Sequence, residues 1–213
     1  MDFKKYNNLI DLFYEQCEKQ DKNKIFLSTL KDPKKNFSWG NVKSFVLQLG
    51  NEISKIINHG DRCLLVSENR PEWMISDLSI MLAGGITVPA YTTYVSRDYE
   101  YIINDCSPTI IIVSNDEQFN KIKNIYERTS SIKKIISFEK LSGIDEDAYI
   151  NLETLFKNNN EKIKLEINAQ RSDPACIIYT SGTQGNPKGV ILSHGGILSN
   201  CEGGYELLKP ILE

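Results

Sequence analysis

A run of hydroxyl and glycine residues that ends in a lysine lies between two short apolar segments near residue 180. Glycines let a ligand approach the backbone closely, while N–H, hydroxyl and ammonium groups donate hydrogen bonds to anionic oxygens. This combination predicts a loop that binds a polyphosphate. An ordinary surface turn, which uses many of the same residue types, is the alternative. The candidate phosphate contacts are Thr180, Ser181, Gly182, Thr183, Gln184, Gly185 and Lys188.

This loop differs from the P-loop of nucleoside triphosphatases. When G-x-x-x-x-G-K-[ST] is counted from Gly182, Pro187 occupies the second glycine position, and Gly189 follows Lys188 where Ser or Thr is required. The hydroxyl that meets magnesium in a P-loop is therefore missing. Residues 189–193 form a second apolar run typical of a strand, so we expect a strand–loop–strand hairpin and not a loop that leads directly into a helix.

Short apolar strands alternate with amphipathic helices along the rest of the chain, which predicts an α/β fold with a largely parallel sheet covered by helices. Gly60 is expected to end the second helix in the left-handed conformation, and Ser96 to cap the fourth. Residues 140–172 break the alternation and are expected to form a surface connection with one short helix. Helices are expected at 8–19, 42–57, 71–83, 96–105, 115–128 and 194–200, and strands at 63–66, 86–88, 109–113, 132–138 and 175–179.

The composition excludes several classes of function. A net charge of −3 and a pI near 5.6 give no global attraction for nucleic acid. The N-terminus has no apolar core of a secretory signal, and no run of about 18 apolar residues could span a membrane. The five cysteines have no zinc spacing and are expected to be buried free thiols, so we expect no metal site and a cytoplasmic location. They are Cys17, Cys63, Cys106, Cys176 and Cys201.

The segment Tyr179–Val190 resembles the Y-T-S-G-T-T-G-x-P-K-G-V motif of adenylate-forming enzymes, which include acyl-CoA synthetases, luciferases and peptide-synthetase adenylation domains. Gln184 stands where threonine is usual; its amide can still donate to a phosphate oxygen. Upstream, "NRPEW", "GGITVPAYTTY" and "SRDYEYIINDCSPTIIIVS" resemble long-chain fatty acyl-CoA synthetases in order and spacing. The resemblance covers most of residues 36–204.

The resemblance implies a two-step ligase. A fatty acid carboxylate attacks the α-phosphorus of ATP with Mg²⁺ to give acyl-AMP and pyrophosphate, and the thiol of coenzyme A then displaces AMP. The loop from Thr180 to Lys188 would hold the β and γ phosphates. His194 lies where relatives often carry "SH", and a capping or packing role is favoured over catalysis because the carboxylate is already ionised at neutral pH. A secondary role at the phosphate site stays open.

The family elements that lie beyond this loop are not found in the sequence. They include a glutamate motif for magnesium, an aspartate for the ribose hydroxyls and a small C-terminal domain with the adenylation lysine, so no catalytic residue is assigned. We expect an incomplete N-terminal large domain of an acyl-CoA synthetase-like fold. It would comprise an α/β subdomain at 1–172 and the start of the next segment at 173–213, without the small domain. The chain alone is expected to be inactive.

Other functions remain open on the sequence alone. A non-catalytic module that binds a nucleotide or a partner is one, and an adenylating ligase for an aryl or amino acid is another. Fatty acid, ATP and coenzyme A are the small-molecule partners that the resemblance implies. An incomplete sheet would leave an edge that favours self-association, and peripheral association with a membrane is left open.

Overall fold

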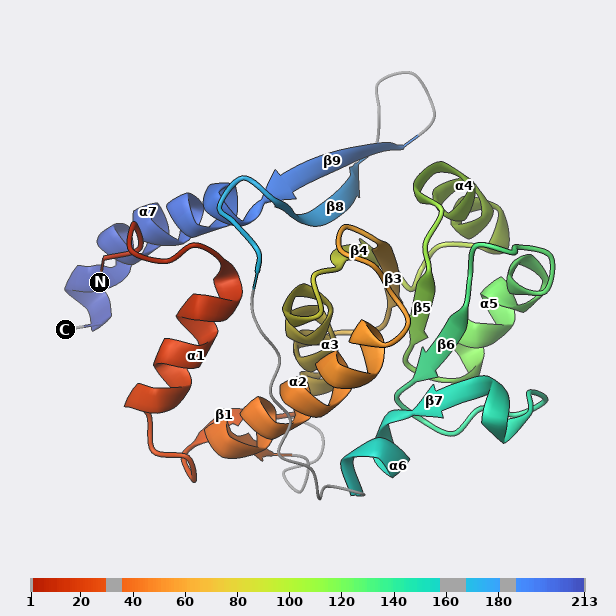
Figure 1. The fold of residues 1–213 in the computed structure, drawn as a ribbon, viewed down its shortest axis with the longest axis horizontal. Helices are drawn as coiled ribbons and strands as arrows, with labels where there is room; N and C mark the ends of the chain where they lie inside the picture. Colours follow the sequence, from red (N-terminus) through yellow and green to blue (C-terminus); the bar gives the residue numbers. More distant parts are fainter. Residues whose placement is uncertain (1, 30–35, 158–167, 181–186, 213) are drawn as a thin grey trace.

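The computed structural model describes residues 2–29, 36–157, 168–180 and 187–212, and the remaining residues lie outside the description. Within these ranges the chain forms an α/β fold in which helices cover both faces of one large sheet (Figure 1). The helices are α1 (Leu9–Lys19), α2 (Trp39–Ser54), α3 (Pro71–Leu82), α4 (Ser96–Cys106), α5 (Asp116–Tyr126), α6 (Leu152–Lys157), α7 (His194–Leu212) and the 3₁₀ helix η2 (Glu146–Ala148). The strands are β1 (Ile25–Leu27), β2 (Phe37–Ser38), β3 (Arg62–Val66), β4 (Ile86–Ala90), β5 (Ile110–Val113), β6 (Lys134–Ser137), β7 (Tyr149–Asn151), β8 (Pro174–Thr180) and β9 (Lys188–Ser193).

The large sheet has the strand order β7-β6-β5-β3-β4-β8-β9. All neighbours pair in parallel except β8 and β9, which form an antiparallel hairpin. Strand β3 is central, with β4 on one side and β5 on the other, so the chain reverses direction across the sheet after β4. The prediction of a largely parallel α/β sheet is confirmed.

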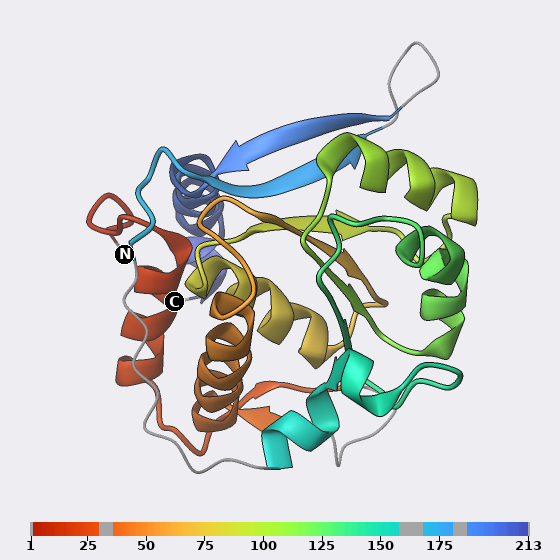
Figure 2. The ribbon, with the colours of Figure 1, turned by 45° about the vertical axis from the view of Figure 1, so that its right-hand side comes forward.

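Two apolar layers account for this arrangement, because a parallel strand must bury both of its faces. Alternate residues of β3 face opposite layers: Leu64 packs with α4 and α5, while Leu65 packs with α2 and α3. Figure 2 shows α4 and α5 on one side of the sheet and α2 and α3 on the other. Helix α1 lies outside α2 and α3 and adds a third apolar cluster.

Several local predictions differ from the structure. Residues 140–172 contain a strand, β7, which extends the sheet next to β6; its three residues are too short to show a period in the sequence. The small antiparallel pair of β1 and β2 was likewise not predicted. Helix α7 continues well past residue 200. The boundary predicted at 172/173 falls just before β8 and stays a prediction, although β8 and β9 belong to the same sheet as β3–β7.

Two predicted caps also have different roles. Gly60 has the expected left-handed conformation (φ 82°), but α2 already ends at Ser54 and Gly60 serves the turn into β3. Ser96 is the first residue of α4 and not its cap. The carboxylate of Asp98 accepts the N–H of Val95 at this end of the helix, because an acidic residue in the first turn satisfies the same free donors.

Candidate functional site

The hairpin of β8 and β9 brings two of the predicted phosphate contacts together. Thr180 and Lys188 are Cα partners at its loop end, where β8 ends and β9 begins, and both are exposed. Directly opposed residues of antiparallel strands have Cβ atoms roughly 5 Å apart, so both side chains can reach one anionic group. The other predicted contacts, Ser181, Gly182, Thr183, Gln184 and Gly185, lie outside the described residues.

The loop end of the hairpin lies at the carboxyl edge of the sheet. Strand β8 runs parallel to β4, with Thr87 opposite Cys176, so Thr180 is at the same edge as the carboxyl ends of the other parallel strands. In open α/β sheets, ligands bind outside this edge. The position of Thr180 and Lys188 is therefore the one that the fold offers to a ligand.

Gly189 is required by packing next to the Thr180–Lys188 pair. A Cβ at this position would lie 2.9 Å from Cγ2 of Ile177 and 3.3 Å from Cζ of Tyr179. Real Cβ atoms do not approach other atoms this closely, so a larger residue would push the strands apart. The glycine that follows Lys188, which distinguishes the sequence from a P-loop, leaves room for the Tyr179 ring.

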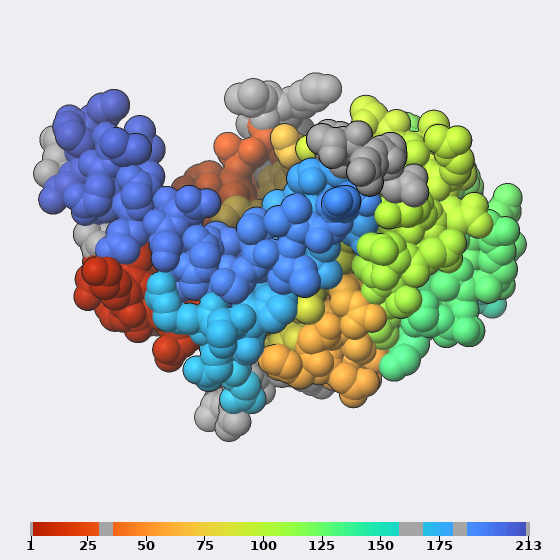
Figure 3. Space-filling view, turned by 90° about the horizontal axis from the view of Figure 1, so that it is seen from above, coloured from red at the N-terminus to blue at the C-terminus, as the bar shows by residue number. Residues whose placement is uncertain are grey.

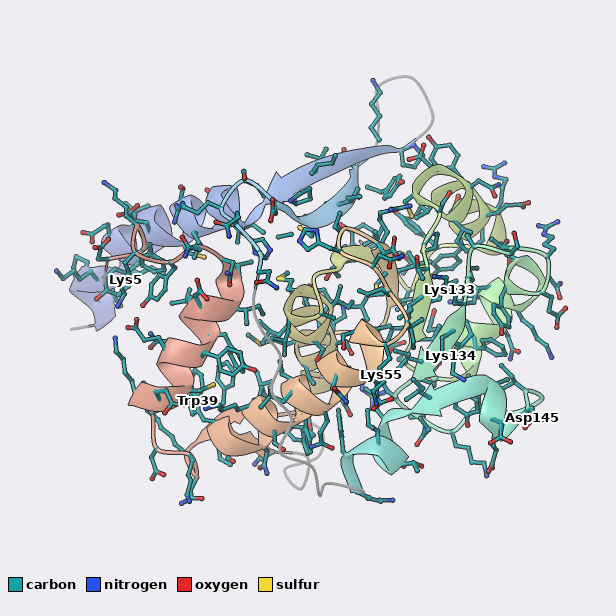
Figure 4. All side chains as sticks on the ribbon, viewed as in Figure 1. Lys5, Trp39, Lys55, Lys133, Lys134 and Asp145 are labelled. Carbon is teal, nitrogen blue, oxygen red and sulfur yellow. The ribbon has the colours of Figure 1, made fainter. Side chains whose placement is uncertain are left out.

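Lys188 has no side-chain ion pair or hydrogen bond within the described ranges. The lysines labelled in Figure 4, in contrast, each have a local partner. Lys5 and Lys55 pair with glutamates, while Lys133 and Lys134 donate to backbone carbonyls. An exposed ammonium without a carboxylate partner is available to an anionic ligand.

Helix α4 contacts strand β8 and the residue that precedes β9, both close to the loop end of the hairpin. The hydroxyl of Tyr179 donates to a carboxylate oxygen of Asp105 at 2.5 Å, and the hydroxyl of Tyr101 donates to the carbonyl oxygen of Pro187 at 3.0 Å. Burial and, next, the bond to Asp105 raise the pKa of Tyr179, so its hydroxyl stays a neutral donor. Figure 1 shows the loop end of the hairpin beside α4.

His194 is not part of this group of residues. It lies at the opposite end of β9 from Lys188 and is 2% exposed. The N–H of Leu9, the first residue of α1, donates to its Nδ1 at 3.4 Å, and burial lowers its pKa against the opposing effects of Asp173 and Asp11. The imidazole is thus a neutral acceptor at the start of α1, a capping and packing position.

The thiols offer no reactive site among the described residues. Four of the five cysteines are buried, and burial raises the pKa of Cys106 and Cys176 to about 11. Cys201 was predicted to be buried but is exposed on α7. No group of three His, Cys, Asp or Glu side chains in the described ranges could hold a metal ion, and no helix there is long and apolar enough to cross a bilayer.

A family model identifies the class of α/β enzyme to which this fold belongs. Residues 13–210 match the family described as AMP-binding enzyme, and the chain belongs to that family. Its matched region contains the complete hairpin and nearly all of α7.

Curated relatives of the chain are fatty acyl ligases. The long-chain-fatty-acid–CoA ligase ACSBG1 of Bos taurus is 33% identical over 138 residues, which is 62% of this chain and 19% of the relative. The long chain acyl-CoA synthetase 3 of Arabidopsis thaliana is 31% identical over 180 residues, 81% of this chain and 27% of the relative. The chain thus spans about a fifth to a quarter of the length of these relatives.

Solved structures share the fold. An anthranilate CoA ligase in complex with anthranoyl-AMP has a TM-score of 0.77 at 25% identity and covers 91% of this chain and 36% of its own. A protein described as a putative long-chain-fatty-acid CoA ligase of Rhodopseudomonas palustris has a TM-score of 0.80 at 16% identity, over 95% of this chain and 48% of its own. The second likeness shows the fold alone.

The buried neutral imidazole of His194 should make stability depend on pH. Because its pKa is lower in the folded state, the unfolded state binds more protons as pH falls below about 6.5, and the free energy of unfolding should fall in that window. We expect His194→Asn, which keeps an acceptor but cannot titrate, to flatten this dependence between pH 7.5 and 5. Denaturant titrations at each pH measure it.

The matched control is His59→Asn, because the sequence has only two histidines and the side chain of His59 is 60% exposed. This variant should keep the fall in stability with falling pH, because His194 is still present. Equal slopes for the wild type and both variants would contradict the assigned role of His194.

Proposed function

We propose that the chain supplies the phosphate-binding hairpin of an ATP-dependent ligase that activates a fatty acid as acyl-AMP and transfers it to coenzyme A. The observation that carries this proposal is the pairing of Thr180 with Lys188 at the carboxyl edge of the sheet, where the lysine has no carboxylate partner among the described residues. The curated relatives, which are long-chain fatty acyl ligases, support the choice of a fatty acid.

The residues present fit the phosphates of ATP by the chemistry of their donors. The ammonium of Lys188 would offset negative charge on the β and γ phosphates, and the hydroxyl of Thr180 would donate to a phosphate oxygen. The predicted contacts at 181–185 would add backbone and side-chain donors. ATP bound with Mg²⁺ supplies an activated phosphorus and a pyrophosphate leaving group. Donors fixed in advance around the leaving group favour the transition state, because charge increases there as the bond breaks.

A ligase for an aryl acid is the second candidate. The solved anthranilate CoA ligase, which holds anthranoyl-AMP, has the same fold over most of this chain. The hairpin would act identically in both cases, since it contacts the phosphates and not the acyl group. A panel of fatty, aryl and amino acids assayed for acid-dependent ATP–pyrophosphate exchange distinguishes the two.

Replacement of Lys188 tests the hairpin directly. In the complete gene product that carries this chain, Lys188→Ala should raise the KM for ATP about tenfold or more, since a hydrogen bond to a charged group contributes about 1.5–3 kcal/mol. Lys133→Ala is the control, because the ammonium of that lysine donates to the carbonyl of Ile56, away from the hairpin. An unchanged KM in Lys188→Ala would exclude phosphate binding by the hairpin.

We further propose that the 213-residue chain alone forms no acyl-CoA. It spans about a fifth to a quarter of the curated relatives, and no group of three potential metal ligands is found among its described residues. Purified chain incubated with fatty acid, ATP, Mg²⁺ and coenzyme A should release no AMP above background. Turnover by this chain would overturn the proposal.

Self-association through β9 is a related proposal. Strand β9 is the last strand of the described sheet, and its exposed apolar residues include Val190 (44%) and Ile191 (62%). An unpaired apolar edge is a template for another strand, and the edge of a second copy can pair with it antiparallel about a two-fold axis.

Sedimentation velocity of the purified 213-residue chain tests this pairing. The wild type should associate with increasing concentration, and Ile191→Lys should shift it toward the monomer because a lysine on an edge opposes pairing. Val95→Lys is the control, since Val95 is equally exposed (61%) but lies outside the strands. A monomeric wild type, or equal effects of the two variants, would contradict the proposal.

We also propose a cytoplasmic location. All five cysteines are free, including the four buried ones, and free thiols persist in a reducing compartment.

A further inference from the structure

Helix α4 presents two polar side chains to the hairpin from a single face. Tyr101 and Asp105 are four residues apart, so they lie one turn above the other on the helix surface. Each contacts a residue next to the loop end of the hairpin. Asp105 contacts Tyr179 in β8, and Tyr101 contacts Pro187, which immediately precedes β9. Seen from above, the hairpin and α7 (blue) lie across this face of the molecule with α4 (lime green) beside the hairpin (Figure 3).

The first contact fixes the end of β8. Tyr179 immediately precedes Thr180, is 4% exposed and donates its hydroxyl to Asp105 at 2.5 Å. A hydrogen bond to a carboxylate from a buried hydroxyl is stronger than one between neutral groups. The ring reaches α4 because Gly189 on the opposite strand has no side chain to block it.

The second contact fixes the start of β9. Tyr101 donates its hydroxyl to the carbonyl of Pro187, which immediately precedes Lys188. Proline restricts its own backbone to a narrow range of φ, so the bond to its carbonyl orients the peptide that leads into Lys188. Residues 180 and 188 are thus each held through a neighbour in the chain.

The helix that provides these contacts is itself rigidly packed. Tyr99 is fully buried, and its hydroxyl donates to the carbonyl of Tyr91 at 2.7 Å. Ile102 and Ile103 are buried against the sheet and α5. A helix held in this way can serve as a fixed support, because buried side chains in a close-packed core have little freedom to shift.

We propose that Tyr101 and Asp105 are positioning residues that set the distance and direction of Thr180 and Lys188 for the phosphates of ATP. The inference rests on the proposed function of the hairpin and goes beyond it, since neither side chain needs to contact the nucleotide. It also assigns the Tyr179 ring as the link from Asp105 to the hairpin. Donors that are fixed before the ligand binds lose less freedom on binding, which is the source of the expected effect.

The test separates the two half-reactions of the complete gene product. Adenylation from ATP needs the phosphate contacts, whereas thioester formation that starts from a synthetic acyl adenylate does not. Tyr101→Phe and Asp105→Ala, each of which removes one partner of a hydrogen bond to the hairpin, should raise the KM for ATP about three- to tenfold, the effect of one hydrogen bond. The rate of thioester formation from the adenylate should stay unchanged. In a Lys188→Ala background, Tyr101→Phe should add little, because both act through the same contact.

Tyr149→Phe is the matched control. The Tyr149 hydroxyl accepts a hydrogen bond from the N–H of Leu141 in a buried position on the other edge of the sheet, so its loss costs stability without affecting the hairpin. Thermal unfolding of all variants reports that cost. The inference is overturned if Tyr101→Phe and Tyr149→Phe have equal effects on the KM for ATP, or if Tyr101→Phe lowers both half-reactions equally.

The proposed function fails by a different result. If Lys188→Ala itself leaves the KM for ATP unchanged, the hairpin does not bind phosphate, and the positioning role of Tyr101 and Asp105 is rejected as well. If Lys188→Ala raises the KM and Tyr101→Phe does not, only the positioning role is rejected.

Discussion

The parallel pairing of β8 with β4 determines where the hairpin can act. Because a parallel strand must point the same way as its neighbour, this pairing directs the end of β8 to the carboxyl edge of the sheet. Strand β9 then returns antiparallel, so the two residues at the loop end of the hairpin, Thr180 and Lys188, lie together at that edge. Without the β4–β8 contact the same sequence would form a hairpin with no fixed place in the fold.

The site consists of a rigid, buried support, which is the frame of the hairpin, and a charged ammonium group that has no ion pair among the described residues. Buried contacts form this frame. The Tyr179 ring fills the space over Gly189, and the buried residues of α4 pack against the sheet and α5. The charge comes from Lys188, which is exposed and has no ion pair among the described residues, whereas Lys5 and Lys55 pair with glutamates. A lysine already paired with a carboxylate would have to lose that partner before it could bind a phosphate, which would weaken binding.

Sequence patterns predicted the elements that carry long apolar runs and missed those that do not. The alternation of strands and helices from 63 to 138 is confirmed because each buried strand is four or five residues long and carries a short apolar run. Strand β7 was missed since its three residues acquire strand geometry only by pairing with β6. The cap of α4 was misassigned for a local reason, as Asp98 satisfies the first turn in place of Ser96.

The candidate site was likewise predictable only in part. Residue types and spacing pointed to Thr180 and Lys188, but the support from Tyr101 and Asp105 depends on contacts between residues 86 and 74 positions apart in the chain. His194, which follows the hairpin in sequence, lies at the wrong end of β9 to meet Lys188. The capping or packing role favoured for His194 agrees with this position, while the residues that hold the hairpin come from a helix distant in sequence.

The central claim is that Lys188 binds the phosphates released as pyrophosphate. Isothermal titration of inorganic pyrophosphate with Mg²⁺ into the complete gene product tests this without catalysis. The account predicts binding by the wild type and an affinity at least about tenfold lower for Lys188→Ala, as expected for the loss of a charged contact. Equal affinities for the two proteins would contradict it.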